Sequence, residues 1–197
     1  RGAIVRHTPR MLPIQDKSFE LSVPIIIVGA GASGICAALT AQEYGVDSLL
    51  LERDETPTGS SALSTCLIPA AGTKLQRQEG VHDTPEAFAA DLIAKAKNQN
   101  DPDMARWVAE ASGPTVDWLV DTVGLPLSLV TGFKYPGHGE YRMHGSPNRT
   151  GSELMAVLTD AVARAGPPLH DGLEIGEVVR ELEHGLHQHV EVRAPGR

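Results

Sequence analysis

The chain has 197 residues, of which 41% are hydrophobic and 21% are charged, so it is long enough to form a globular domain with a hydrophobic core. Its formal net charge of −8, without any cluster of lysine and arginine, argues against nucleic acid as a partner. Two cysteines without metal-ligand spacing predict neither a disulfide framework nor a zinc site, and they fit a reducing, cytoplasmic compartment.

The ends of the chain and its apolar runs set further expectations. No apolar run approaches the roughly 20 residues that a membrane-spanning helix needs, so we expect no membrane span. The chain begins with Arg1 rather than Met and shows no charged-then-apolar leader, so export stays open. Residues 1–23 mix proline, charge and short apolar patches and predict an N-terminal arm, whereas residues 24–197 predict one domain.

The first regular elements form a strand, helix and strand in order. Residues 24–28 are a β-branched run without polar alternation, typical of a strand buried on both faces of a parallel sheet. Residues 32–44 are rich in alanine and leucine and end at Gly45, which predicts a helix with a glycine stop. Residues 46–51 predict a second strand that closes with Glu52. This is the βαβ order of a dinucleotide-binding motif.

Three glycines stand at the turn between the first strand and the helix. Gly29 allows the tight turn, Gly31 lets the backbone approach a pyrophosphate, and Gly34 permits close helix packing. The helix N-terminus near Ala32 offers unpaired N–H groups to the phosphates, and Glu52 can accept hydrogen bonds from ribose hydroxyls. The alternative is a glycine-rich turn of an unrelated α/β protein; the βαβ context favours dinucleotide binding.

The stretch after Glu52 separates two cofactors. A nicotinamide dehydrogenase would continue into another helix and strand, but here a long loop rich in glycine, serine and threonine follows. Residues 59–65 can supply N–H and hydroxyl donors to the diphosphate, ribityl chain and flavin edge of an immobile cofactor. A solvated surface loop would explain this polarity, but not the apolar CLIPAAG run that comes next. The sequence therefore favours FAD.

An ordered series of motifs from about Pro24 onward resembles a known family. The motifs are VPIIIVGAGASGICAAL, LLLERDETPTGSSALSTCLIPAAGTKLQRQEGVHDTPEAF, NDPDMARWVAEASGPTVDWLVDTVGLPL and YRMHGSPNRTGSELMAVLTDAVARAG. Together they are similar to the N-terminal part of the fumarate reductase and succinate dehydrogenase flavoproteins, a family that also includes 3-ketosteroid dehydrogenases and urocanate reductases.

The resemblance implies an α/β fold: a Rossmann-like FAD-binding domain of the glutathione reductase type, with a parallel sheet, several helices and a C-terminal β-hairpin. It also implies three sets of FAD contacts. The diphosphate contacts Gly29, Gly31, Ala32, Ser33 and Gly34; the adenosine contacts Glu52, Arg53 and, through its backbone, Val179; and the diphosphate, ribityl chain and isoalloxazine are lined by Gly59, Ser60, Ser61, Ser64, Thr65 and Gly72.

Two residues depart from the family pattern. Thr58 stands where the family usually has the first of two glycines, which bears on how closely the backbone approaches the cofactor there. Ser60 stands where the respiratory members carry the histidine that is bonded to the flavin. The resemblance therefore implies non-covalent FAD.

The chain also departs from the family in length. The family continues with a second glycine-rich flavin contact, a capping domain and a C-terminal segment that completes the FAD site. Its substrate-binding arginines, histidines and threonine lie in that later part, so no catalytic residue is assigned here. We expect an N-terminal piece, a split subunit or a truncated product.

The resemblance implies an FAD-dependent oxidoreductase that acts on CH–CH bonds. Flavin N5 would exchange hydride with a carbon of an activated C–C single or double bond in a small-molecule substrate. One alternative is a non-catalytic FAD-binding module that needs a second chain. An NAD-dependent dehydrogenase is less favoured, because no nicotinamide-half βαβ unit follows.

The remaining sequence predicts helices and a hairpin. Thr84 and Pro85 start one helix, and Asp101 and Pro102 start another, whose apolar positions we expect in the core: Met104, Trp107, Val108 and Ala111. Gly113 and Pro114 are expected to interrupt that helix before residues 116–120 resume it. Thr150 and Glu153 form a capping box for a helix that packs on the sheet and ends at Gly166 and Pro167. Residues 178–182 and 189–192 predict a hairpin.

Histidines and a cysteine invite functional readings that we set aside. Alternating histidines on a polar hairpin arise by chance, so no metal site is predicted from His184, His187 and His189. His138 and His144 are interpreted as structural, and Cys66 as a buried, inert thiol.

Overall fold

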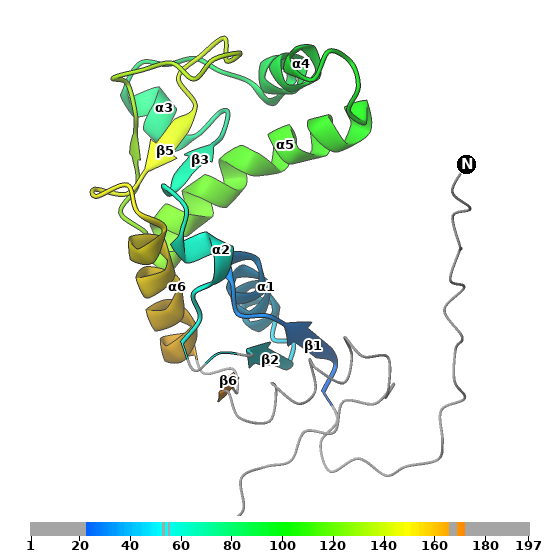
Figure 1. Cartoon of the computed structure of the whole chain (residues 1–197), viewed down its shortest axis with the longest axis vertical. Helices are drawn as coiled ribbons and strands as arrows, with labels where there is room; N and C mark the ends of the chain where they lie inside the picture. Colours follow the sequence, from blue (N-terminus) through cyan, green and yellow to red (C-terminus); the bar gives the residue numbers. More distant parts are fainter. Residues whose placement is uncertain (1–22, 53, 55, 166–168, 172–197) are drawn as a thin grey trace, which may run out of the picture.

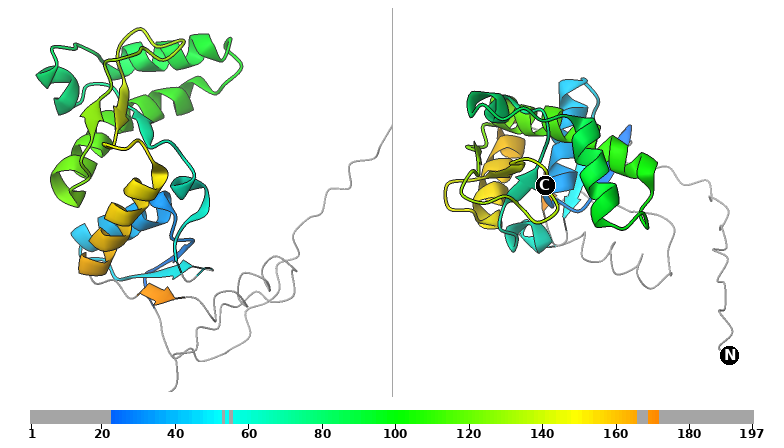
Figure 2. Two further views of the ribbon diagram at one scale, coloured as in Figure 1. Left: turned by 60° about the vertical axis from the view of Figure 1, so that its left-hand side comes forward. Right: turned by 90° about the horizontal axis from the view of Figure 1, so that it is seen from above.

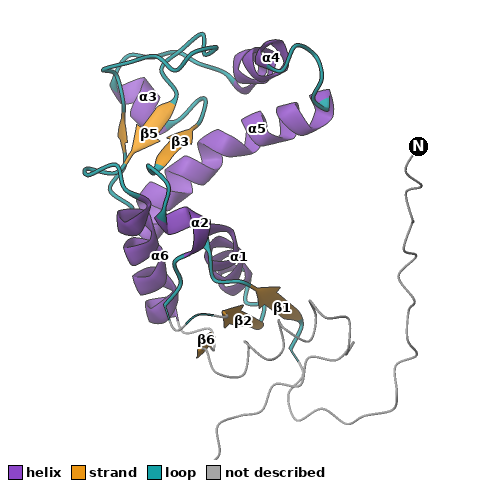
Figure 3. Cartoon of the chain, in the orientation of Figure 1, coloured by secondary structure: helices purple, strands orange, loops and turns teal. Residues whose placement is uncertain are grey.

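A computed structural model describes residues 23–52, 54, 56–165 and 169–171. The described residues form two sheets that are well separated in space (Figures 1 and 3). The helices are α1 (Ala32–Glu43), α2 (Gly59–Ala62), α3 (Lys74–Gln78), α4 (Pro85–Lys95), α5 (Pro102–Trp118) and α6 (Gly151–Ala165), with a π-helical turn η1 (Leu119–Val123). The strands are β1 (Ile25–Val28), β2 (Ser48–Glu52), β3 (Leu67–Pro69), β4 (Ser128–Leu129), β5 (Met143–Gly145) and β6 (Leu169–Asp171).

The first sheet is parallel and has the strand order β1-β2-β6. Strand β1 runs into α1, and the chain returns through Gly45, whose φ of 66° ends the helix, into β2. The predicted βαβ unit and the mixed helix and sheet architecture are thus confirmed. Helices α1 and α6 lie side by side over this sheet (Figures 1 and 2), and their apolar faces share one core with Leu50 of β2.

The expected burial of the first strand is wrong. Three of its side chains are exposed, Ile25 by 39%, Ile26 by 50% and Val28 by 58%, whereas Leu49, Leu50 and Leu51 of β2 are buried. The cause is the position of β1 at the edge of the sheet, where β2 is its only partner among the described residues. An apolar run without alternation therefore marks a parallel strand here, but one with an uncovered side.

The second sheet is antiparallel, with the order β3-β5-β4, and lies in the same part of the molecule as α3, α4 and α5 (Figures 1 and 3). Its strand β3 and the short helix α2 both fall in the stretch that the sequence predicted as one long loop. Each is at most four residues long, which is too short for hydrophobic periodicity to reveal.

Helix α5 corrects a second expectation, because it is not interrupted at Gly113 and Pro114. Gly113 is buried, and a Cβ there would lie 2.3 Å from the carbonyl oxygen of Ala71, so this glycine lets the helix lie directly on another backbone segment. The helix ends in η1 and then in Gly124, whose φ is 83°.

The outer face of α5 is a third correction. Met104 is 52%, Trp107 63% and Val108 50% exposed, and Ala111 is exposed as well, so these four residues do not form core. Val116 further along the helix is buried.

The helices that begin at Pro85 and Gly151 start where predicted. Of the predicted box at the second helix, Thr150 Oγ1 accepts from Glu153 N at 3.3 Å, but the Glu153 carboxylate accepts from Asn148 N at 3.1 Å and not from Thr150 N. The Thr84 side chain caps α4 by accepting from Ala87 N.

Several predictions concern residues outside the described part of the chain. These are the arm before residue 23, Arg53, the stop at Gly166 and Pro167, the hairpin with Val179, and the histidines of that hairpin. They stay predictions.

Candidate cofactor site

The glycine turn after β1 has the geometry that its sequence predicts. Gly29 has a φ of 96° and donates its N–H to Leu51 O over 2.7 Å, which ties the turn to β2. A Cβ on Gly34 would lie 1.9 Å from Gly29 O, so only glycine allows α1 to pack this closely on the turn. Gly31 is the N-terminal cap residue of α1.

Few acceptors are available to the N–H groups at the N-terminus of α1. Gly31 provides no side-chain cap, and the first helical N–H, that of Ala32, donates to Ser61 Oγ at 3.2 Å. Within the described residues, the N–H groups of Ser33 and Gly34 have no acceptor. These groups and the positive end of the helix dipole form a site for an anion.

Glu52 lies at the same turn. One carboxylate oxygen, Oε2, accepts the N–H of Ala30 at 2.7 Å, and the other, Oε1, accepts the N–H of Asp54 at 3.0 Å. The carboxylate is thereby fixed at the end of β2 beside the glycine turn, and each oxygen keeps a lone pair for a further donor.

The serine-rich stretch contains helix α2, which contacts the N-terminus of α1 through Ser61. Gly59 has a φ of 51° and open space where a Cβ would be, and Ser61 reaches α1 as described. Ser64 is used internally, donating to Ser61 O at 2.8 Å and accepting from Cys66 N at 3.2 Å. Ser60 and Thr65 are exposed.

Helix α6 supports this stretch from behind. The N–H of Gly151 donates to Ser64 O at 2.7 Å, and a Cβ on Gly151 would lie 1.9 Å from Ser61 O. A glycine at the start of α6 therefore allows direct contact with the backbone of α2. The sequence did not point to Gly151, because the residue that it packs on is remote along the chain.

The stretch that ends at Gly72 lies on α5. Ala71 N donates to Ser112 Oγ at 3.1 Å, and Gly72 O accepts from Arg77 Nη1 at 2.6 Å. Gly72 has a φ of 72°. Thr73 then caps α3 in a reciprocal box with Gln76, a T-x-x-Q signal that is present in the sequence and was missed.

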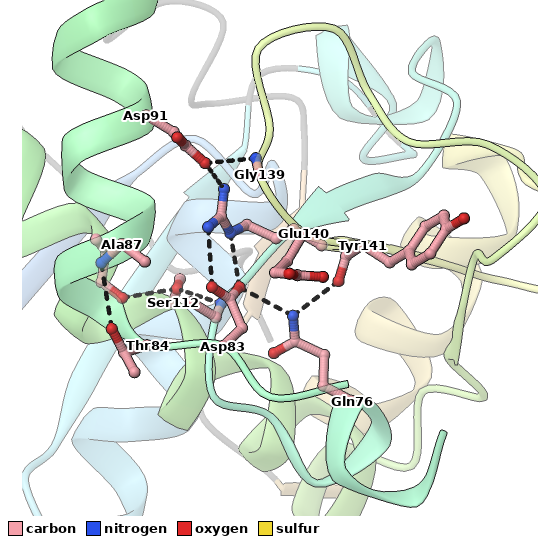
Figure 4. A network of polar contacts seen from close by, with 12 residues as sticks. Gln76, Asp83, Thr84, Ala87, Asp91, Ser112, Gly139, Glu140 and Tyr141 are labelled. Carbon is pink, nitrogen blue, oxygen red and sulfur yellow. Dashed lines mark hydrogen bonds and ion pairs between the residues drawn. The ribbon is translucent and has the colours of Figure 1, made fainter. Parts of the chain in front are cut away.

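A buried charged network lies behind this stretch (Figure 4). The guanidinium of Arg142 is 1% exposed and binds both oxygens of Asp83, with Nε at 2.6 Å and Nη2 at 2.8 Å, while Nη1 pairs with Asp91. The same guanidinium lies 4.8 Å from the ring centroid of Phe88. Burial opposes the charge on Arg142, but its bonds to the two carboxylates outweigh burial and raise its pKa.

The network continues toward Thr73 through Gln76. Its Nε2 donates to Asp83 Oδ2 at 3.1 Å and to Tyr141 O at 2.8 Å (Figure 4). Its Oε1 accepts from Thr73 N at 3.1 Å. Asp91 also accepts the N–H of Gly139 at 2.6 Å, which holds the loop before β5. Nothing in the sequence pattern marked these long-range contacts.

Both predicted structural histidines lie in this region. His144 is fully buried, and burial lowers its pKa. His138 packs between Phe88 and Tyr135, and burial together with the charge of Arg142 lowers its pKa. Cys66 is buried, as predicted, and burial raises the pKa of the half-buried Cys36 thiol. The part of the chain that the structure describes contains no cluster of side chains suited to a metal.

The arrangement fits a dinucleotide. The structure brings together the glycine turn, the open N-terminus of α1, Glu52 and Ser61, which are the donors and the acceptor that a diphosphate and a ribose require. Ser60, Thr65 and Gly72 follow along the same chain, and Ser64, which is also exposed, uses its hydroxyl in bonds to Ser61 O and Cys66 N. Among the described helices, none combines the length and hydrophobicity needed to cross a bilayer.

Comparisons with known proteins agree with this geometry. Residues 24–194 match a family described as FAD binding domain. The fumarate reductase of Schizosaccharomyces pombe is 31% identical over 157 residues, which cover 79% of this chain and 30% of that protein. The urocanate reductase of Eggerthella lenta is 28% identical over 149 residues, covering 76% of this chain and 24% of that protein.

Solved structures show the same similarity. The open conformation of a flavocytochrome c3 fumarate reductase has a TM-score of 0.67 and 29% identity, covering 77% of this chain and 27% of that one. A 3-ketosteroid-Δ4-(5α)-dehydrogenase from Rhodococcus jostii RHA1, at a TM-score of 0.66 and 24% identity, covers 79% of this chain and 38% of that one and shows the fold alone. The chain spans less than a third of the length of the two curated relatives.

Proposed function

The chain belongs to the FAD-binding domain family, and from this premise we propose that it supplies the FAD-binding part of an oxidoreductase that acts on CH–CH bonds. In this proposal residues 24–197 belong to one Rossmann-like domain of the glutathione reductase type, preceded by an arm at 1–23. The observation that carries the proposal is the uncapped N-terminus of α1, which Glu52 and Ser61 flank.

In this proposal, different residues bind different parts of the cofactor. We propose that the diphosphate binds at the glycine turn and at the N–H groups of Ser33 and Gly34, and that Glu52 binds the adenosine ribose. Arg53 and the backbone of Val179 are proposed to complete the adenosine site. Residues 59–65 and Gly72 are proposed to line the remaining length of the cofactor.

The FAD is proposed to be non-covalent, because Ser60 offers no imidazole for a bond to the flavin. When bound, FAD supplies hydride transfer between its ring and a carbon of an activated C–C bond. This chain's own residues bind and orient the cofactor. We assign none of them to catalysis. A small molecule with an activated C–C bond is the proposed substrate class, as the names of the similar reductases suggest.

A second candidate, an FAD-binding module that works only with further polypeptide, is favoured by the exposed edge of β1. Apolar side chains of a parallel strand are exposed there, at Ile25, Ile26 and Val28. Further strand or helix packed on this edge would bury them. The two unpaired thiols are the basis on which we propose a cytoplasmic location.

The test begins with the visible absorbance of the purified chain. We expect flavin bands after incubation with FAD and removal of the excess, and release of intact FAD on mild denaturation. NAD at the same concentration should not displace it. A chain that stays colourless with added FAD, or that binds NAD in preference, would contradict the proposed cofactor.

A further inference from the structure

Hydrogen bonds from neighbouring elements hold the backbone from Ala70 to Thr73 in place. Ala70 N donates to Arg142 O at 2.9 Å, Ala71 N donates to Ser112 Oγ at 3.1 Å, and Thr73 N donates to Gln76 Oε1 at 3.1 Å. Within the described residues, the N–H of Gly72 has no acceptor. It is therefore the N–H group of this stretch that remains for a bound molecule.

His144 joins this stretch through Thr73. Its Nε2 lies 2.9 Å from Thr73 Oγ1, and its Nδ1 lies 3.2 Å from Ile68 O. A carbonyl oxygen only accepts, so Nδ1 carries a proton and donates to Ile68. In the neutral imidazole Nε2 then accepts the hydroxyl proton of Thr73. The contacts thus define one tautomer.

The hydroxyl group of Thr73 uses both its donor and an acceptor position in hydrogen bonds. Its hydroxyl oxygen accepts from Gln76 N at 3.0 Å and its hydroxyl proton goes to His144. Both Thr73 and His144 have no exposed surface. The imidazole therefore spans β3 and the start of α3, the two ends of the stretch that contains Gly72, and fixes their separation.

We propose that His144 is a positioning residue that acts through Thr73: it fixes the backbone at Gly72, so that the Gly72 N–H is aimed at the flavin ring and tunes its reduction potential. This inference rests on the proposed function only in its last step. An N–H aimed at the ring stabilises the electron-rich, reduced flavin, so a displaced Gly72 should make the potential more negative.

The experiment compares four variants of the chain. Thr73→Val removes the hydroxyl, His144→Gln replaces the imidazole, and Thr73→Ser keeps the hydroxyl. Ser146→Ala is the matched control, because Ser146 is also buried, lies two positions from His144 and has a hydroxyl without a hydrogen-bond partner among the described residues. Amide exchange at residues 70–73 is measured without FAD, and the potential and visible bands are measured with FAD.

In Thr73→Val and His144→Gln we expect exchange at residues 70–73 to be about tenfold faster, a more negative flavin potential and shifted visible bands. Thr73→Ser and Ser146→Ala should match the parent chain. Unchanged exchange in the first two variants would overturn the positioning role. Faster exchange with an unchanged potential and spectrum would overturn the link to the flavin. Failure of the parent chain to bind FAD would instead contradict the proposed function, and the flavin step with it.

Discussion

Two regions of the molecule use their polar groups in opposite ways. In the turn region, residues 25–52, the N-terminus of α1 lacks a side-chain cap from Gly31 and keeps N–H groups without acceptors among the described residues. In the support region, residues 67–146, Arg142, Asp83 and Gln76 are buried and bind one another. Ligand-binding capacity therefore lies where donors are left unpaired among the described residues, as at the N-terminus of α1 and at the N–H of Gly72, and rigidity lies where donors are paired.

The largest effect should come from breaking the support region. Arg142→Leu leaves Asp83 and Asp91 without their cation, and we expect the free energy of unfolding to fall by about 3–5 kcal/mol. Urea denaturation measures this. Arg164→Leu is the control, because the ion pair of Arg164 with Asp160 is exposed and contributes about 0.5 kcal/mol. Equal losses in the two variants would show that the buried network is not what stabilises this region.

A substitution in the turn region should lower the free energy of unfolding by less, but it should also prevent FAD binding. Gly34→Ala places a Cβ 1.9 Å from Gly29 O, which should cost about 3 kcal/mol and abolish FAD binding. Gly45→Ala at the other end of α1 meets open space, and its φ of 66° should cost about 1 kcal/mol with FAD binding kept. Calorimetry and FAD titration measure both. Retained FAD binding in Gly34→Ala would contradict the role of the turn.

Removing the carboxylate beside the turn should affect binding more than folding. Glu52→Ala deprives Ala30 N and the ribose of an acceptor, and we expect the dissociation constant of FAD to rise about tenfold. Fluorescence titration of FAD measures it. Glu110→Ala, on the exposed surface of α5, should leave the constant unchanged. An unchanged constant in Glu52→Ala would place the ribose elsewhere.

The smallest effect is the dependence of stability on pH, which arises from two histidines of the support region. The pKa values of His144 and His138 are lowered in the folded chain, so below their ordinary value of about 6.5 the unfolded state binds more protons. Stability should therefore rise with pH in the window below about 6.5, by at most about 1.4 kcal/mol per unit for each histidine. The lowered pKa of Asp91 acts in a more acidic window.

Denaturation curves from pH 5.5 to 7.5 test this expectation. His144→Gln should reduce the slope of stability against pH, because it removes one of the two histidines that bind more protons in the unfolded state than in the folded state. His82→Gln is the matched control, since His82 is exposed. A slope that is the same in His144→Gln and in the parent chain would show that His144 does not carry the effect.

The sequence predicted those features that depend on neighbouring residues. The βαβ unit, the glycine turn and the cap at Thr84 follow from local patterns, and the structure confirms them. Distant contacts decided the rest. Helix α5 continues through Pro114 with Gly113 packed on Ala71, and the side chain of Trp107 is exposed although its spacing is that of a core residue.

The candidate site was predicted in the same partial way. Its glycines and Glu52 are marked by a known spacing, whereas the residues that support it are marked by none, apart from the box of Thr73 and Gln76. Arg142 meets its carboxylates across 59 and 51 positions, and no local pattern reports such pairs. Contacts of this kind depend on the completed fold.

The contacts of the candidate site also determine how the chain must fold. The bond of Ala30 with Glu52 closes 22 positions, that of Ala32 with Ser61 closes 29, and that of Thr73 with His144 closes 71. Closing long loops costs chain entropy before any contact compensates it, so the site should be among the last parts to form. A cofactor that binds only the finished site would then slow unfolding and leave the rate of folding nearly unchanged.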